Sequence, residues 1–283
     1  MRRTTEGQPR GIRWTLFDTP EDLDFVNNLA LLSHTHQHIQ EKTCCLSRFS
    51  QQVGLQISKR KTEVMTLNVN APAPILLDDQ ALPSTETFTY LGSVVRQDRG
   101  TTEDIHSRLH KARNAFRSLN AVCRSSQYSI KTKLKLCQSC ILLTLPNGSE
   151  CWWMAEHDLA ELSSFHTASL RKIQRIFWPR TISNHDLLAQ CQEDHMETII
   201  TRKQWRWTGH VLRKNANSIT KVTIHWIQDR KRKHGWLKTT WRRTVEVEMK
   251  KMNHSWGTIQ RLASDRQGWR SFVAALYANW HDR

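Results

Sequence analysis

The stretch formed by residues 23–32 constrains the fold of this chain more than any other. An apolar run is interrupted by two adjacent polar residues, Asn27 and Asn28, and then resumes. Two apolar segments that flank such a short polar pair are typical of two strands joined by a tight turn. The stretch therefore predicts a hairpin whose tip presents two amide side chains. An ordinary turn explains the same pair, because turns favour asparagine.

The length and composition of the chain predict a folded protein of one or two domains. Its 283 residues are 38% hydrophobic and 24% charged, which provides for a core and argues against a wholly disordered chain. The sequence holds no apolar run of the roughly 18 residues that a membrane span needs, and the residues after Met1 do not form the apolar segment of a signal peptide. Seven scattered cysteines suit a reducing compartment. We expect an intracellular protein of the cytoplasm or the nucleus.

The positive charge of the chain is concentrated in its last third. The formal net charge is +16, and residues 200–283 hold 19 lysines and arginines against 5 aspartates and glutamates. A segment with this excess is expected to bind a polyanion such as nucleic acid. A basic surface that is merely solvated is the alternative.

Residues 101–124 carry the most regular helical pattern of the chain. Apolar residues recur there at steps of three and four, which places them on one face of a helix. Thr101 or Thr102 can cap the first turn. The expected apolar face comprises Ile105, Leu109, Ala112, Phe116, Leu119 and Cys123.

Amphipathic periodicity predicts several further helices. Ser129 and Asp158 have side chains that cap helices, and Gly54 and Pro179 are typical of residues that end them. With these boundaries, helices are expected at residues 34–53, 129–145 and 158–177, from 182 onward, and at 241–252 and 269–280.

Short strands and turns are expected between residues 55 and 100. Met65, Leu67 and Val69 alternate with polar residues, which is typical of a half-buried strand. Asp78 and Asp79 are adjacent carboxylates, but their position between two apolar segments indicates a hairpin turn and not a metal site. The apolar segments are residues 75–77 and 88–92.

We assign no metal-binding residue from the sequence. Cys137 and Cys140 form a single C-x-x-C without a second pair at zinc spacing, and packing inside a helix explains them best. His34, His36 and His38 alternate along the chain and would not share one face of a helix. We expect these three histidines at the surface.

The expected hairpin resembles the F/Y-A-D-D core of the reverse transcriptases of non-LTR (LINE-type) retrotransposons. Here Phe25, Val26, Asn27 and Asn28 stand where the family has Phe-Ala-Asp-Asp. The family's carboxylates hold two divalent ions that clamp the attacking and leaving oxygens. Mg²⁺ prefers carboxylate oxygens, and an amide brings no negative charge. The resemblance therefore implies an RNA-directed DNA polymerase whose catalytic positions are degenerate here, so that we expect neither polymerase activity nor a bound cofactor.

Further motifs extend the resemblance over residues 11–283. Residues 54–64 resemble the family's G-L-x-I-N-x-x-K-T-K, and residues 88–92 resemble its F-x-Y-L-G. Residues 148–152 keep the pattern Gly-x-Glu-x-Trp. The later matches are residues 171–184 to R-R-I-x-W-P-x-T-I-S-N, residues 202–214 to R-K-R-R-W-x-W-x-G-H-x-L-R-K, and residues 265–270 to D-R-x-x-W-R.

The resemblance implies an α+β fold that is mostly α. A partial reverse-transcriptase palm, made of the hairpin and short antiparallel strands, would be followed by a helical thumb and a helical basic C-terminal region. Few residues precede the hairpin, so we expect a C-terminal piece of the retrotransposon polyprotein, without the first palm carboxylate. A palm that lacks its other strands has an open sheet edge, which predicts marginal stability. The expected divisions are a lead-in at 1–22, the partial palm with a primer-grip-like hairpin at 23–100, thumb-like helices at 101–180 and the basic helical region at 181–283.

The resemblance also assigns roles to residues of the partial palm. Asn27 and Asn28 occupy the catalytic positions, and Lys61 lies near the phosphates of the incoming nucleotide in the family. Tyr90 and Gly92 belong to the element that grips the primer strand. A solvated basic loop explains Lys61 equally well.

Basic residues of the thumb and of the C-terminal region are the expected contacts to RNA or DNA. Trp205 and Trp207 lie about 200° apart on a helix, so that one faces outward if the other is buried. An outward tryptophan between arginines can stack on a base, whereas a wedge between two helices is the alternative. Besides these two tryptophans, the expected contacts are Arg108, Lys111, Arg202, Lys203, Arg206, Arg213, Lys214, Arg230, Lys231, Arg232 and Lys233.

Three hypotheses follow for the function. The first is a truncated reverse transcriptase that no longer polymerises but binds RNA or DNA backbones, with an intact copy of the element's polyprotein as a further partner. The second is residual polymerase activity with carboxylates supplied by another chain. The third is a non-functional genomic remnant that folds poorly.

Overall fold

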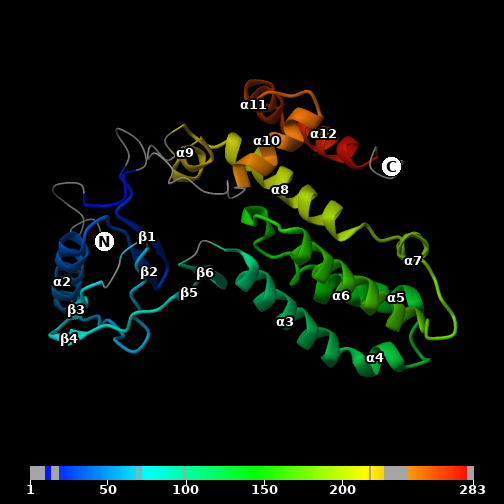
Figure 1. The fold of residues 1–283 in the computed structure, drawn as a ribbon, viewed down its shortest axis with the longest axis horizontal. Helices are drawn as coiled ribbons and strands as arrows, with labels where there is room; N and C mark the ends of the chain where they lie inside the picture. Colours follow the sequence, from blue (N-terminus) through cyan, green and yellow to red (C-terminus); the bar gives the residue numbers. More distant parts are fainter. Residues whose placement is uncertain are drawn as a thin grey trace. The chain divides into compact units, whose positions relative to one another are not determined.

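The computed structural model describes residues 10–13, 19–67, 69, 72–97, 100–216, 218–225 and 241–278 (Figure 1). The chain divides into two compact units. The N-terminal unit comprises Met1–Gly100 and Asn215–Gly235, and the C-terminal unit comprises Thr101–Lys214 and Trp236–Arg283. Helices predominate among the described residues, together with three small antiparallel two-stranded sheets. The expected class, α+β and mostly α, is confirmed.

The predicted hairpin is present in the N-terminal unit. β1 (Asp22–Phe25) pairs in antiparallel register with β2 (Asn28–Leu31), and Phe25 lies opposite Asn28. Val26 and Asn27 form the turn, in which Val26 adopts a left-handed φ of 57°. Asn27 therefore lies in the turn, whereas Asn28 begins the second strand.

α2 (His36–Gln52) confirms the helix expected at residues 34–53. Thr35 caps it by accepting the backbone N–H of His38 at 3.3 Å, and Gly54 follows its end with φ 73°. The spacing of Ile39, Leu46, Phe49 and Val53 predicts one apolar face for this helix, and this expectation is wrong at Val53, which is 70% exposed. The buried side chains of α2 are instead polar: Lys42, Thr43 and Ser47. Lys42 bonds to the hairpin and Ser47 to the β3–β4 turn described next, while the Thr43 hydroxyl donates to the Ile39 carbonyl of α2 itself.

Two more hairpins complete the strands of this unit. β3 (Leu76–Leu77) and β4 (Gln80–Ala81) flank Asp78 and Asp79, whose positive φ values of 47° and 61° confirm the expected turn. β5 (Thr87–Tyr90) and β6 (Ser93–Arg96) flank Leu91 and Gly92. The small apolar cluster of the unit comprises Ile75, Leu77 and Leu82, with Ile39, Ile57 and Val64 partly buried against it.

The strand expected at residues 65–69 is wrong. Val64 makes only an isolated parallel bridge to Ser84, and Leu67 and Val69 are 42% and 51% exposed. Within the described residues no neighbouring strand pairs with this segment, so its backbone stays irregular. The described strands form three separate sheets and not one palm-like sheet. The unit also includes the short helix α9 (Ile219–His225).

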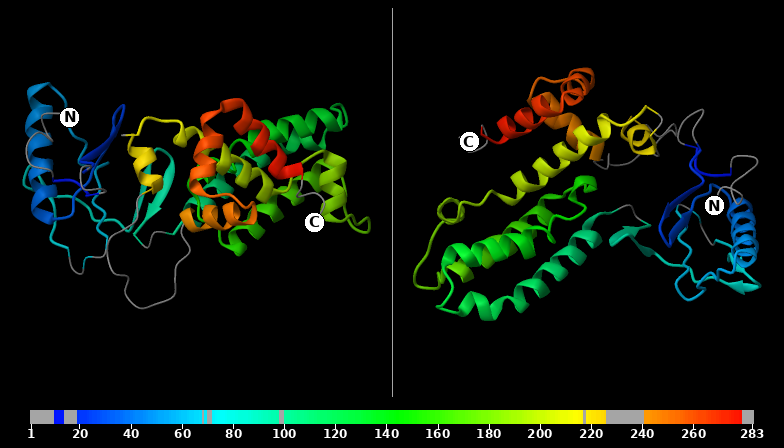
Figure 2. Two further views of the ribbon diagram at one scale, coloured as in Figure 1. Left: turned by 90° about the horizontal axis from the view of Figure 1, so that it is seen from above. Right: turned by 180° about the vertical axis from the view of Figure 1, so that it is seen from behind.

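The C-terminal unit is helical, and its helices pack on two sides of α8 (Met196–Leu212) (Figures 1 and 2). On one side lie α3 (Thr102–Ser118), α4 (Asn120–Arg124), α5 (Ile130–Cys137), the π-helical turn η1 (Gln138–Leu142), the 3₁₀ turn η2 (Ser149–Cys151), α6 (Glu156–Gln174) and α7 (Asn184–Cys191). On the other side lie α10 (Trp241–Lys251), α11 (Trp256–Ser264) and α12 (Arg266–Ala278).

α8 belongs to two apolar cores at once. Its first half contributes Met196 and Ile200 to the core beneath α3 and α6. Its second half contributes Trp205 and Leu212 to the core beneath α10, α11 and α12. The helix therefore holds both halves of the C-terminal unit together.

Several helix boundaries differ from the sequence expectations. The helix expected at 101–124 breaks at Leu119 into α3 and α4, although its apolar face is confirmed. The Thr101 hydroxyl donates to the Trp153 carbonyl and does not cap the helix. α6 begins at Glu156, so Asp158 is a buried residue of the first turn and not its cap. The same helix ends at Arg175, in left-handed conformation, before Trp178-Pro179.

Other expectations for this unit are confirmed. Ser129 caps α5 by accepting the N–H of Thr132 at 3.2 Å. The helix expected from residue 182 onward is α7, and Ser183, which was not expected as a cap, caps it. Cys137 is buried in the core. α5 passes into the π-helical turn η1 and does not continue as an α-helix to residue 145, and α11 was not expected from the sequence. None of the helices in the described part of the chain is long and apolar enough to cross a membrane.

Candidate nucleic-acid interface

α8 has one buried face and one basic face. At about 100° per residue, its basic side chains fall within about 140° of the helix circumference. The opposite face is buried and includes Gln204, Trp205 and Thr208. We call this stripe the α8 basic face, in which Arg206 and His210 are exposed and the others are half-buried. It comprises Arg202, Lys203, Arg206, Trp207 and His210 of α8, with Arg213 and Lys214 directly after the helix.

Contacts hold the first part of the α8 basic face to its own unit. Arg202 donates to Asp194 at 2.7 Å, and Lys203 donates to the Pro146 carbonyl at 3.0 Å. These two basic side chains are thus engaged within the fold. Arg206, one turn further along, is exposed.

Trp205 lies in the core and is not a base-stacking residue, which corrects the sequence expectation for it. Its side chain is 2% exposed, and its Nε1 donates to the Glu248 carboxylate at 2.7 Å. The rings of Trp269 and Phe272 from α12 pack against it at 6.0 and 6.2 Å. Trp207 is half-buried and packs edge-to-face on Trp241 at 5.6 Å. The sequence left two alternatives for these tryptophans, and the second, packing as a wedge between helices, applies to Trp205.

Two arginines of α12 lie near enough to Arg213, the C-cap of α8, for their charges to affect its pKa. Arg213 Nη1 donates to the Ala263 carbonyl at 3.0 Å. Burial, and then the like charges of Arg266 and Arg270, lower the pKa of the Arg213 guanidinium from its ordinary value. Arg266 and Arg270 are exposed one turn apart on α12. We call Arg213, Arg266 and Arg270 the arginine cluster.

The neighbouring carboxylate does not neutralise this cluster through hydrogen bonds to arginine. Asp265 accepts the backbone N–H groups of Gln267 and Gly268, each at 2.9 Å, and so caps α12. Like charges held this close favour binding of an anion, and guanidinium groups bind phosphate in bidentate geometry. The cluster is therefore suited to a phosphate group.

Two sequence motifs meet to build the cluster. A Cβ atom at Gly209 would lie 2.0 Å from Trp269 Nε1, so only glycine allows α12 to pack this closely on α8. Trp269 Nε1 donates to the Trp205 carbonyl at 3.2 Å. This contact joins residues 202–214 to residues 265–270. Sequence reasoning missed Arg266 and Arg270 as site residues, although their spacing of four on a helix was a usable signal.

The two thumb residues predicted to bind nucleic acid have different environments. Arg108 is buried at 7% exposure, with its Nε 3.8 Å from Asp104. The Asp104 carboxylate also accepts Trp152 Nε1 at 2.7 Å. The expectation that Arg108 lies on an exposed basic face is wrong, because this carboxylate draws it inward. Lys111 is exposed.

The hairpin tip carries exposed amides and a carboxylate pair behind them. Asn28 Nδ2 donates to Asn27 Oδ1 at 3.3 Å, and both residues are exposed. Asp22 and Asp24 lie two residues apart on β1, and burial, together with the charge of Asp24, raises the pKa of Asp22. Among the described residues, no group of three His, Cys, Asp or Glu side chains is placed to hold a metal ion.

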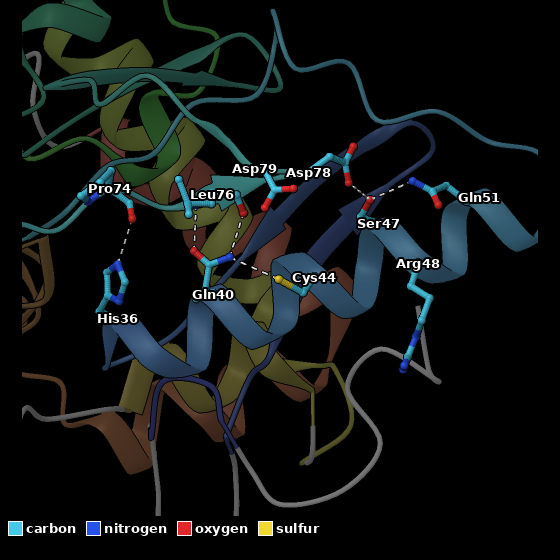
Figure 3. Close-up of a pocket in the computed structure, with 10 residues that line it drawn as sticks. All are labelled: His36, Gln40, Cys44, Ser47, Arg48, Gln51, Pro74, Leu76, Asp78 and Asp79. Atoms are coloured by element: carbon cyan, nitrogen blue, oxygen red, sulfur yellow. Dashed lines mark hydrogen bonds between the residues drawn. The ribbon is translucent and has the colours of Figure 1, made fainter.

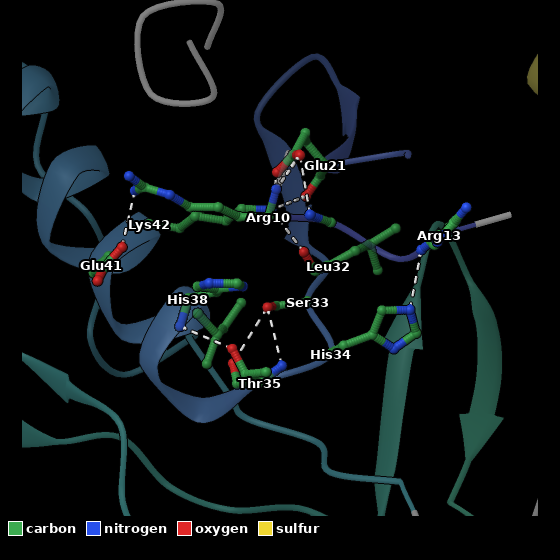
Figure 4. Close-up of polar contacts among 12 residues, drawn as sticks. Arg10, Arg13, Glu21, Leu32, Ser33, His34, Thr35, His38, Glu41 and Lys42 are labelled. Atoms are coloured by element: carbon green, nitrogen blue, oxygen red, sulfur yellow. Dashed lines mark hydrogen bonds and ion pairs between the residues drawn. The ribbon is translucent and has the colours of Figure 1, made fainter. Parts of the chain in front are cut away.

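A buried lysine anchors the base of the hairpin (Figure 4). Lys42 is fully buried, and its Nζ donates to the carbonyls of Glu21 at 3.1 Å and Leu32 at 2.7 Å. It also forms an ion pair with the Glu21 carboxylate. Burial opposes ionisation of Glu21, but hydrogen bonds from Lys42 and from the Arg10 and Gly11 backbones outweigh it, so that the pKa of Glu21 is lowered. The hairpin is thus positioned by polar contacts.

The remaining palm residues are only partly brought together. Tyr90 Oη donates to the Leu23 carbonyl at 3.2 Å, which places β5 against β1. Gly92 has a φ of 82° in the β5–β6 turn. Lys61 is exposed in a turn closed by its N–H bond to the Ser58 carbonyl. The structure thus joins Tyr90, but not Lys61, to the hairpin that carries Asn27 and Asn28.

A cavity of about 500 Å³ lies between α2 and the β3–β4 turn (Figure 3). Gln40 bonds both the N–H and the carbonyl of Leu76 at 2.8 Å, as a paired strand would. Asp78 accepts Ser47 Oγ at 2.6 Å and lies 3.4 Å from Lys59 Nζ. The Ser47 bond, opposed by burial and aided by Lys59, lowers the pKa of Asp78. These polar groups bond to one another. We therefore interpret the cavity as part of the packing between α2 and the β3–β4 turn and not as a ligand site.

The basic run at Arg230, Lys231, Arg232 and Lys233 lies outside the described residues. No protein-family model matches the chain, and no curated protein or solved structure is significantly similar to it. The link to the retrotransposon family therefore rests on the sequence motifs alone.

Proposed function

We propose that this chain is a polymerase-inactive relative of the non-LTR retrotransposon reverse transcriptases that binds the phosphate backbone of RNA or DNA through its C-terminal unit. The observation that carries the proposal is the arginine cluster. Arg213, Arg266 and Arg270 come from two of the motifs that carry the resemblance, and the charges of Arg266 and Arg270 contribute to the lowered pKa of Arg213.

An anion between these side chains would relieve their repulsion. Arginine stays charged and offers a planar set of donors that matches phosphate oxygens. Arg206 and Lys214 on the α8 basic face would extend the contact along a strand. Contacts of this kind position a nucleic acid without reading its sequence, which fits sequence-independent binding.

Loss of polymerisation follows from the chemistry of the hairpin tip. Asn27 and Asn28 offer neutral amide oxygens where two-ion catalysis needs carboxylates. Asp22 and Asp24 lie on β1 behind the turn and do not take the place of the missing pair. We therefore assign the chain binding and not synthesis.

The test compares two charge-matched double variants of the full chain. Arg266→Gln/Arg270→Gln removes two charges from the cluster, and Lys250→Gln/Lys251→Gln removes two exposed charges from α10. We expect the first variant to weaken binding of a labelled RNA–DNA hybrid at least about tenfold at low salt, because each phosphate contact contributes separately to affinity. The second variant should bind nearly as the wild type does. An equal loss in both would attribute binding to net charge and remove the cluster from the proposal.

A further inference from the structure

The end of α6 presents aromatic side chains to solvent. Trp178 is 90% exposed and Phe177 is 62% exposed. Of the tryptophans that the structure describes, the others are buried or half-buried. Large exposed aromatic side chains are uncommon on a folded surface and often mark a binding site.

The loop that carries Trp178 is braced at both ends. Ile176 is buried, and Ile182 packs against the same cluster from the far side of the loop. Arg171 Nη2 donates to the Ile182 carbonyl at 3.1 Å, and the Arg180 N–H bonds the Phe177 carbonyl at 2.9 Å. The fold thus fixes a turn that holds Trp178 away from the core.

The surroundings of this turn are strongly basic. Residues 124–135 and 171–182 together contain 8 lysines and arginines and no aspartate or glutamate. Arg175 Nη2 donates to the Arg124 carbonyl at 2.5 Å, which brings the two segments together. Lys133, in the first of these segments, is buried and donates to the carbonyls of Cys123 and Ser125.

A cavity lies where the two segments meet. Its volume is about 210 Å³, and Tyr128, Ile130, Lys133 and Arg175 contribute to its lining. Tyr128 is 47% exposed at its edge. Exposed aromatic rings next to basic side chains are the arrangement that proteins use for unpaired nucleotides, whose base faces are free to stack.

We propose that this surface binds single-stranded RNA or DNA, with a base stacked on Trp178 and phosphates on Arg175 and Arg180. The inference rests on the proposed function, and it adds a second site that selects unpaired strands. A duplex hides its base faces inside its own stack, so the Trp178 contact is closed to it. The arginine cluster binds phosphates of either form.

The experiment measures binding of a short single strand and of the matching duplex to the full chain. Trp178→Ala should weaken single-strand binding about tenfold, in the range of one lost stacking contact, and leave duplex binding unchanged. Trp178→Phe keeps a ring and should restore most of the affinity. Leu143→Ala truncates another apolar side chain of this unit, which is 66% exposed, and should change neither affinity.

The outcomes separate this inference from the proposed function. One outcome is that the wild type binds both ligands while Trp178→Ala changes neither affinity or lowers both equally. That result would overturn the stacking site at Trp178 and leave the arginine cluster as the proposed binding site. If the wild type binds neither ligand, both proposals fail. If Trp178→Ala abolishes binding to phosphatidylserine vesicles but not to the single strand, the surface meets a membrane and the inference is overturned.

Discussion

Different interactions stabilise the folds of the two units: polar contacts predominate in the N-terminal unit and apolar burial in the C-terminal unit. Among the described residues, the apolar cluster of the N-terminal unit has 3 buried members, whereas the two larger cores of the C-terminal unit have 13 and 8. The N-terminal unit relies instead on the buried ammonium of Lys42 and on the side-chain amide of Gln40, which bonds to strand β3. Apolar burial is non-directional and tolerant, while a buried polar network is stable only when every member is satisfied.

This difference shows which unit depends less on specific polar contacts. The N-terminal unit, which carries the hairpin with Asn27 and Asn28, depends on specific polar partners, and its strands form three separate pairs. The unit that carries the arginine cluster has its own cores, tied together by α8. The proposed binding function therefore resides in the more self-sufficient unit.

The largest expected effect tests the apolar core of the C-terminal unit. Leu109 is fully buried on α3, and Leu109→Ala should lower the free energy of unfolding of that unit by about 3–4 kcal/mol through lost transfer energy and a cavity. Leu143→Ala, the same change at an exposed site, should cost less than about 0.5 kcal/mol. Urea unfolding, monitored by hydrogen exchange separately in each unit, measures the free energy of unfolding. Equal costs for the two variants would contradict the account of this core.

The next effect tests the polar anchor of the N-terminal unit. Lys42→Met leaves the Glu21 carboxylate and two carbonyls without their ammonium donor, and should destabilise α2 and the hairpin by about 3 kcal/mol. Lys59→Met removes a solvent-exposed ion pair with Asp78 and should leave the stability of the unit nearly unchanged. Hydrogen exchange should speed up in the N-terminal unit alone. If Lys42→Met is neutral or stabilising, the polar anchor does not hold this unit.

A smaller effect on the C-terminal unit depends on pH. His166 on α6 is 1% exposed, and its Nε2 has no hydrogen-bond partner among the described residues. Burial, with a contribution from the charge of His195, lowers the pKa of His166 to about 4 from its ordinary value of 6.5. Between these values the unfolded chain binds a proton that the folded chain excludes. Stability is therefore present above about pH 6.5 and is lost as the pH falls toward about 4.

The expected size is roughly 2 kcal/mol between about pH 7 and about pH 5, from about 1.4 kcal/mol per unit of pH below the unfolded pKa. Denaturant unfolding at a series of pH values measures it. The matched variant is His166→Leu, which should flatten the dependence in this window. An unchanged slope in that variant would assign the acid sensitivity to other groups.

Locally coded features were the ones predictable from the sequence. The hairpin at residues 23–32, the turn at Asp78 and Asp79, and the cap at Ser129 all depend on residues a few positions apart. Helix ends were less predictable. The end of α6 at Arg175 depends on how Ile176 docks into a distant cluster.

Features that depend on distant partners could not be read from the sequence. From the sequence, a lysine in an amphipathic helix such as Lys42 is expected to be solvated. Only the fold brings Glu21 and Leu32 to its ammonium group. The sequence favoured an outward tryptophan at residues 205 or 207, but α12 covers Trp205, and among the described tryptophans it is Trp178 that is exposed. The match between Gly209 and Trp269 likewise appears only when α12 packs on α8.

The central claim is that the arginine cluster binds nucleic-acid backbone, and the most direct test is affinity for an RNA–DNA hybrid across a salt series. We predict that the logarithm of the affinity falls steeply and linearly with the logarithm of salt, and that Arg266→Gln/Arg270→Gln lowers the slope by about 2, since each duplex phosphate contact contributes about 0.9. A shallow dependence, or a slope that this double variant leaves unchanged, would contradict the claim.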